Sequence, residues 1–281
     1  MKKTINIILF LMLFNISFDS FSQEKIEKSK EEIKQGSKSH GNNKRNHSRA
    51  SSASFENYDS FQNVIFRGVA QVFIFVTYYA AIGNYDGEAH LHSNLTNYPY
   101  DNGISGNYVN ADSAFTSMRF LRFDLEDKFL YSNESLFGNH LKFKIRPFQY
   151  FYLQTDYFQL REFNKIHAEY SDLSLFAFNL CYDRIRFERF NFGWTLGLNY
   201  LGNDVRKAGF SYGLNAEIFI AKNISLYSSI KWSLINKVPV NEFELQGKYH
   251  LRKCFLSLGY EHIKIGSPNY DFIAMGGGIY L

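Results

Sequence analysis

Cysteine and proline are both scarce in this chain of 281 residues, which has two of the first and four of the second. The cysteines, Cys181 and Cys254, fall on segments that we expect to be well-separated strands. A disulfide framework is therefore not predicted, and both thiols are expected to be buried or to face lipid.

Excess charge is lacking outside one short region. The formal net charge is +4, and residues 24–50 alone contain eight Lys or Arg and four Glu. The rest of the chain is close to neutral. Because nucleic-acid binding needs basic residues clustered on a folded surface, the sequence predicts no nucleic-acid partner.

The first residues have the pattern of an export signal. Lys2 and Lys3 precede a mostly apolar run over residues 5–14, and small serines flank a cleavage point before Gln23. The run is too short for a bilayer-spanning helix, which needs about 20 apolar residues. We predict that residues 1–22 are a cleaved signal peptide. No cysteine follows it, which excludes lipid attachment there.

Residues 23–57 are dominated by Glu, Lys, Ser, Asn and His. Ile26 and Ile33 are the only large apolar residues before Phe55. Burial of so little apolar surface would not offset the conformational entropy that the segment loses on folding. We predict a disordered polar leader, with at most a frayed helix over 24–35. A metal-binding tract at His40 and His47 is disfavoured against a solvated tail.

Residues 64–82 are apolar except for Arg67, Gln71 and Thr77. Three interpretations compete: an inner-membrane helix, a helix packed at the periplasmic mouth of a barrel, and an additional strand. We favour the second, because alternation is absent and Arg67 and Gln71 would share one helical face.

Residues 83–113 are rich in turn-forming pairs such as Gly83-Asn84 and Asp86-Gly87. A connector of this length often has a function of its own. We therefore assign residues 58–113 to a segment that packs on the periplasmic mouth or partly plugs the lumen. Its tyrosines are available for burial, namely Tyr85, Tyr98, Tyr100 and Tyr108.

From residue 114 onward, apolar and polar residues alternate. Phe192, Trp194 and Leu196, for example, alternate with Gly193 and Thr195, and the chain as a whole contains 29 Phe and 20 Tyr. Alternation over about ten residues is typical of a membrane-spanning strand with one lipid-facing side. We predict an all-β fold in which residues 114–281 form a closed antiparallel transmembrane β-barrel of about ten strands.

The predicted connections alternate between short and longer ones. Short turns are expected near Pro147 and at 188–191, 221–223 and 252–254. An exported barrel usually begins and ends in the periplasm, so these turns are assigned to the periplasmic side.

An export signal, a polar leader and ten amphipathic strands together resemble the outer-membrane β-barrel proteins of Gram-negative bacteria. The last strand adds alternating Ile273, Met275, Ile279 and Leu281, although Leu281 stands where the family usually has Phe. The resemblance implies an outer-membrane location, contact with outer-membrane lipids and assembly by the barrel-assembly machinery. It indicates no subfamily.

Charged residues are predicted to line the barrel interior on alternating positions. Neighbouring rows of opposite sign favour cross-strand ion pairs and a mostly closed lumen. We therefore expect a structural or binding barrel; the alternative is a narrow channel for ions or small solutes. The lumen-lining candidates are Arg122, Asp124, Glu126, Lys142, Lys144, Arg146, Lys231, Glu242, Glu244, Lys248 and Glu261.

A lipid-modifying enzyme is the remaining alternative. Outer-membrane phospholipases and lipid A deacylases carry a His-x-Ser-Asn motif on a strand, whereas here Ser93 follows His92 directly. His262 beside Glu261, and His167 near Glu169, have no serine at a suitable spacing. We predict no enzymatic activity, metal ligand or cofactor, and the sequence leaves the oligomeric state open.

Overall fold

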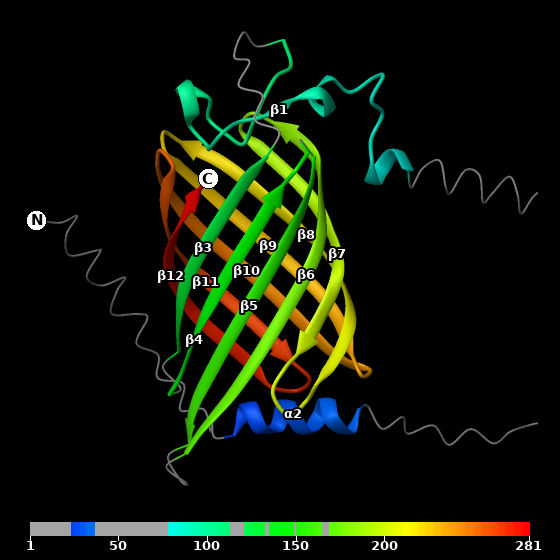
Figure 1. Ribbon diagram of the computed structural model, residues 1–281, viewed down its shortest axis with the longest axis vertical. Coiled ribbons are helices and arrows are strands. Elements are labelled where there is room, and N and C mark those ends of the chain that lie inside the picture. The colour runs from blue at the N-terminus through cyan, green and yellow to red at the C-terminus, as the bar shows by residue number, and fades with distance from the viewer. Residues whose placement is uncertain (1–23, 37–77, 113–120, 133–134, 149, 165–168) are drawn as a thin grey trace, which may run out of the picture.

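The structure of the protein, a computed structural model, describes residues 24–36, 78–112, 121–132, 135–148, 150–164 and 169–281 (Figure 1). The predicted signal peptide, the leader from residue 37 and the apolar segment up to residue 77 lie outside the described residues. Ten antiparallel strands, β3 to β12, close into a barrel in which β12 pairs with β3. The predicted closed ten-stranded antiparallel barrel is thus confirmed.

The strands vary in length from 11 to 19 residues. β6 is the longest strand, because its hairpin with β5 extends beyond the neighbouring strands (Figure 1). The barrel strands are β3 (Arg122–Ser132), β4 (Leu136–Arg146), β5 (Phe151–Asn164), β6 (Glu169–Phe187), β7 (Phe190–Leu201), β8 (Lys207–Ala221), β9 (Ile224–Ile235), β10 (Val238–Leu251), β11 (Cys254–Ile265) and β12 (Asn269–Tyr280).

The outer wall of the barrel is apolar and the inner face is polar. Leu198, Phe210 and Leu258 are between 55% and 61% exposed on the outside, while charged residues of the opposite parity are buried inside. A soluble barrel has the reverse arrangement, with its apolar residues in the core. Cys181 on β6 and Cys254 on β11 are free thiols on separate strands, as predicted.

Helix α2 (Lys25–Gln35) lies across one barrel mouth, at the far end from the start of β3 and the end of β12 (Figure 1). Ile26 and Ile33, two helical turns apart, are fully buried and join a core cluster that includes Ile265. The frayed helix that we expected is therefore a continuous, docked one. A helix of 11 residues is marginal alone, and tertiary burial of one face stabilises it.

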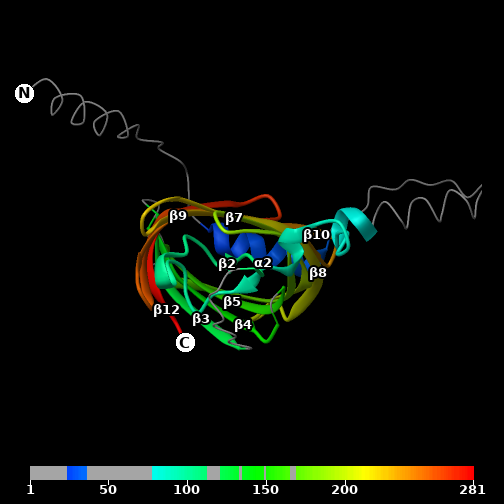
Figure 2. The ribbon, with the colours of Figure 1, turned by 90° about the horizontal axis from the view of Figure 1, so that it is seen from above.

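Residues 78–109, called the cap below, cover the other mouth (Figure 2). Within it, β1 (Asn94–Leu95) pairs with β2 (Tyr108–Val109), and two 3₁₀ turns, η1 (Ala89–His92) and η2 (Asp101–Gly103), complete it. The assignment of residues 58–113 as a whole to the periplasmic mouth or a plug stays a prediction. Among the four tyrosines only Tyr108 is fully buried. Among the described residues, no helix combines the length and hydropathy needed to span a bilayer.

Candidate functional site: the charged barrel interior

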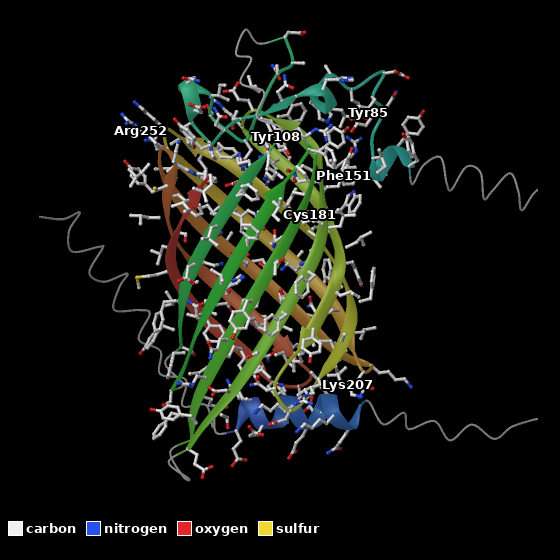
Figure 3. The ribbon with its side chains drawn as sticks, in the orientation of Figure 1. Tyr85, Tyr108, Phe151, Cys181, Lys207 and Arg252 are labelled. Carbon is white, nitrogen blue, oxygen red and sulfur yellow. The ribbon has the colours of Figure 1, made fainter. Side chains whose placement is uncertain are left out.

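The eleven lumen-lining candidates all lie on the inner face of the barrel. Ten are at most 8% exposed, and the Asp124 side chain is 12% exposed. The two-residue period of each strand places them there, because their neighbours in sequence face outward. Figure 3 shows the two ends that bound this interior, with Tyr108 and Arg252 at the cap end and Lys207 at the α2 end.

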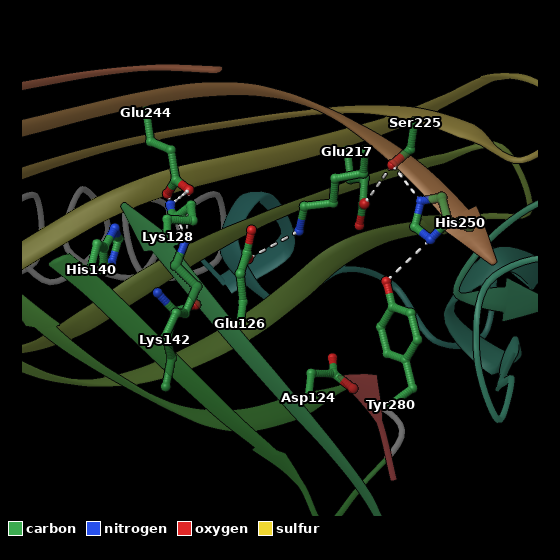
Figure 4. Close-up of polar contacts among 12 residues, drawn as sticks. Asp124, Glu126, Lys128, His140, Lys142, Glu217, Ser225, Glu244, His250 and Tyr280 are labelled. Carbon is green, nitrogen blue, oxygen red and sulfur yellow. Dashed lines mark hydrogen bonds and ion pairs between the residues drawn. The ribbon is translucent and has the colours of Figure 1, made fainter. Parts of the chain in front are cut away.

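A central cluster joins strands that are not neighbours. Lys128 on β3 lies 2.5 Å from Glu244 on β10 and also contacts Glu261 on β11. The Lys142 ammonium lies 2.6 Å from Glu244 (Figure 4). β3 and β10 are separated in the barrel by β11 and β12, so these ion pairs pass through the lumen and join strands that are not adjacent.

A second cluster continues from the first. Lys231 on β9 lies 2.7 Å from Asp156 on β5 and 3.2 Å from Glu242 on β10. His140 bridges the two clusters, with Nε2 at 3.1 Å from Asp156 and Nδ1 at 2.9 Å from Glu261. The clusters therefore form one network of contacts from β3 to β9, through the middle of the barrel.

These contacts differ from the predicted pairing in their reach. Glu126 and Lys142 are directly opposite in register on β3 and β4, yet Glu126 contacts Lys248 and Lys142 contacts Glu244. Pairs between neighbouring strands do occur, as between Lys231 and Glu242. The lumen of a ten-stranded barrel is narrow enough for long side chains to reach across it.

Sequence reasoning missed three members of the network: Lys128, His140 and Asp156. Two of them lie an even number of positions from a residue that was predicted to face the lumen. Lys128 is two positions after Glu126 on β3, and His140 is two positions before Lys142 on β4. The parity signal was therefore present. Which of these residues meet depends on barrel closure.

His140, Glu244 and Glu261 lie close enough together to ligate a metal ion, and this trio was not predicted. The Lys128 ammonium, however, contacts both carboxylates. The positive charge that such a site needs is already supplied by this side chain.

The network changes character toward the cap. Arg122 pairs with Asp124 at 2.7 Å, and Arg146 pairs with Asp183 at 3.0 Å. Lys144 has no hydrogen bond or ion pair among the described residues, and its ammonium lies 4.9 Å from the Tyr227 ring centroid. A cavity of about 20 Å³ remains among these groups, which is room for about one water molecule.

Ser225 and His250 form an unpredicted serine–histidine contact of 2.8 Å (Figure 4). Ser225 Oγ also lies 3.0 Å from a Glu217 oxygen, and Tyr280 Oη lies 3.3 Å from His250 Nδ1. Because a carboxylate only accepts, Ser225 donates to Glu217 and accepts from His250 Nε2–H. In this arrangement the histidine donates to the serine and does not accept its proton, and both residues are buried.

Among the described residues, the histidines considered for catalysis fall in two places, the η1 turn and β11. His90 is in η1 beside Arg184, and His92 Nε2 lies 2.7 Å from the Tyr85 carbonyl oxygen. His262 faces outward on β11 and pairs with Asp271 at 2.7 Å. His167 lies outside the described residues.

The barrel caps both ends of helix α2. Glu162 accepts hydrogen bonds from the backbone amides of Lys25 at 3.2 Å and Ile26 at 2.9 Å. At the other end, the Asn236 amide donates to the Ile33 carbonyl oxygen at 2.6 Å. A carboxylate at a helix N-terminus satisfies free N–H groups and interacts favourably with the helix dipole.

Arginines of β6 attach the cap. Arg184 donates to both carboxylate oxygens of Glu88 at 2.9 Å and to the Tyr79 carbonyl oxygen at 3.1 Å. These hydrogen bonds from Arg184 lower the pKa of Glu88. Deeper in the mouth, the Tyr108 hydroxyl donates to Asp183 at 2.5 Å, and burial raises the pKa of Tyr108 well above its ordinary value.

No protein-family model and no curated protein matches this chain. Among solved structures, it is similar to the outer membrane protein Ail of Yersinia pestis, at 11% identity and a TM-score of 0.32 over 57% of this chain and 98% of that one. LpxR from Salmonella typhimurium has 10% identity and a TM-score of 0.34, over 58% and 84% of the two chains. An outer membrane channel from Pseudomonas putida has 7% identity and a TM-score of 0.31, over 57% of this chain and 94% of that one. At these values the likeness carries no argument about activity.

Proposed function

We propose that this protein is an outer-membrane β-barrel with a closed interior, and that its role is structural or binding. The apolar outer wall supports the membrane location, because side chains such as Leu198 and Leu258 would otherwise face water. By the usual convention for exported barrels, the cap lies on the periplasmic side, where β3 begins and β12 ends.

The observation that carries this proposal is the bridge made by Lys128. Its ammonium reaches past β12 to a carboxylate of β11 and past β11 and β12 to one of β10, and Lys231 on β9 reaches Asp156 on β5, four strands away in the barrel order. Ions that crossed the barrel would have to displace buried pairs whose separation leaves uncompensated charge. Helix α2 and the cap cover the two ends of the same path.

Planar-bilayer recording of the purified full-length protein tests the proposal. We expect no steady single-channel steps, and none after deletion of residues 24–36, because the central bridges remain. Replacing Lys128 and Lys142 by Ala in a variant that lacks both residues 24–36 and the cap should open a cation-selective path, since Glu244 and Glu261 stay in the lumen. Steps of fixed size from the unaltered protein would contradict the proposal.

A narrow anion channel is the second candidate, and the basic cap end favours it. Arg122, Lys144, Arg146 and Lys248 surround the small cavity there. For this candidate, the unaltered protein would conduct with a reversal potential set by chloride, and Lys144→Glu would weaken that selectivity. The same recordings therefore separate the two candidates.

A further inference from the structure

The outer wall has two unlike sectors. On β7 to β9 the outward side chains are large and apolar over most of the strand length, and an apolar groove of about 400 Å³ lies there. It is lined by Ala81, Trp194, Thr195, Leu196, Tyr212, Gly213, Leu214 and Trp232. This sector is suited to lipid chains.

The opposite sector, on β3 to β5, carries polar side chains on its outward face, from the centre of β3 toward the exposed Arg161–Asp172 ion pair of β5 and β6. Asp127 faces outward between Leu125 and Phe129 on β3. Asn139 on β4 donates to Asp127 at 2.7 Å and is directly opposite Gln159 on β5. We call Asp127, Asn139 and Gln159 the polar patch.

The polar patch has unused hydrogen-bonding capacity. Asp127 Oδ2 and the Gln159 amide have no hydrogen bond among the described residues, and both side chains are exposed. In hydrocarbon no water satisfies them, and polar side chains at that depth are costly unless they find a partner. Asp127 is the central residue of β3, so headgroups at the two membrane surfaces are remote from its carboxylate.

We propose that the polar patch is where a second copy of this chain docks, side by side in the membrane. The proposal rests on the membrane location proposed above. The patch is self-complementary, because the Asp127 carboxylate accepts hydrogen bonds and the Asn139 and Gln159 amides donate them. A two-fold axis through it sets Asp127 of one copy against an amide of the other, which is the geometry of an isologous interface.

The surface next to Asp127 permits a close approach. Gly277 on β12 is directly opposite Asp127 in register and presents no side chain to the outside. Small residues at interfaces between membrane segments bring backbones together and strengthen packing and hydrogen bonds. The apolar neighbours Phe129 and Phe137 would form the rim of the interface.

Site-directed cross-linking in membranes tests the docking surface. In a Cys254→Ser background, Phe137→Cys places a thiol beside the patch and leaves its polar groups intact. Leu214→Cys, in the apolar sector, is the matched control. We expect a cross-linked species of twice the chain mass from Phe137→Cys, at least five times more abundant than from Leu214→Cys.

Adding Asp127→Leu, Asn139→Leu and Gln159→Leu to Phe137→Cys should reduce the yield of this dimer about tenfold. Asp127→Asn, whose side-chain oxygen still accepts a hydrogen bond and whose amide adds a donor, should retain it. Equal yields from the two thiol positions, or a product of another mass, would overturn the proposal. Heat-modifiable migration of each variant reports barrel insertion separately, so a failure of the membrane assignment would be distinguished from a failure of docking.

Discussion

The two ends of this barrel are closed by segments that different interactions hold in place. At one end, α2 buries two isoleucines and is held at its termini by Glu162 and Asn236. At the other, the cap is attached largely through arginine contacts such as Arg184 with Glu88. The α2 end therefore depends chiefly on its two buried isoleucines, whereas the cap end adds arginine hydrogen bonds and charge to buried Leu91, Leu95 and Tyr108. Conditions that release one end should leave the other in place.

The middle of the barrel differs from both ends because its contacts cannot be released singly. Lys128 serves two carboxylates, and His140 links that cluster to Asp156. We infer that the ends determine access to the lumen, and that the central network determines whether it conducts.

The largest effect is expected from Lys128→Ala. Removing one partner of a buried ion pair leaves its carboxylates uncompensated, and the free energy of unfolding should fall by about 3–5 kcal/mol. Denaturant unfolding in detergent micelles measures this. Lys264→Ala, on the outward face near the strand end, should change stability by no more than about 0.5 kcal/mol. Equal effects of the two changes would refute a stabilising central network.

Ile33→Ala should release the α2 end alone. Loss of a buried isoleucine costs about 2–5 kcal/mol of docking free energy. Once undocked, a helix of 11 residues is only marginally stable in water, so α2 should unfold. Trypsin should then cleave at Lys28 and Lys34, while barrel migration on gels stays unchanged. Glu31→Ala, at an exposed position of the same helix, is the control. Cleavage that spreads into the cap would contradict independent closures.

Glu162→Gln should have a smaller effect at the same end. The amide oxygen still accepts from the Lys25 and Ile26 N–H groups, but the charge that favours the helix N-terminus is lost. We expect about 0.5–1 kcal/mol less docking free energy, measured as faster hydrogen exchange within α2. No change relative to the unaltered protein would show that the carboxylate charge contributes nothing.

Acidification should loosen the cap end by the smallest amount. Because Arg184 lowers the pKa of Glu88 in the folded state, their contact stabilises the cap fully above the ordinary glutamate pKa. This stabilisation is lost as the pH falls from about 4.3, the ordinary pKa of glutamate, through the lower pKa of Glu88 in the folded protein. Hydrogen exchange of residues 78–92 at pH 6 and pH 3 measures it, with Glu88→Gln as a variant in which this pH dependence should shrink.

The fold was predictable because its signal is local. The two-residue period that separates Trp194 from Thr195, or Arg122 from Leu121, is legible in any short window and assigns each side chain to one face. Chain order and short turns then suffice for an antiparallel barrel. The eleven lumen candidates follow from the same parity.

The pairing of those candidates was not predictable, for a physical reason. The contact of Lys128 with Glu244 joins residues 116 positions apart and exists only after ten strands have closed. Helix α2 shows the same limit: Ile26 and Ile33 look too few to fold, and their partners, such as Ile265, belong to the far end of the chain. Both features depend on tertiary contacts that local pattern does not encode.

The central claim, that side-chain ion pairs close this lumen, is tested most directly by ion flux through liposomes that contain the intact protein at known copy number. The account predicts chloride and potassium efflux no faster than from protein-free liposomes, at neutral pH and moderate salt. Rapid efflux of either ion from liposomes whose protein shows full heat-modifiable migration would contradict it.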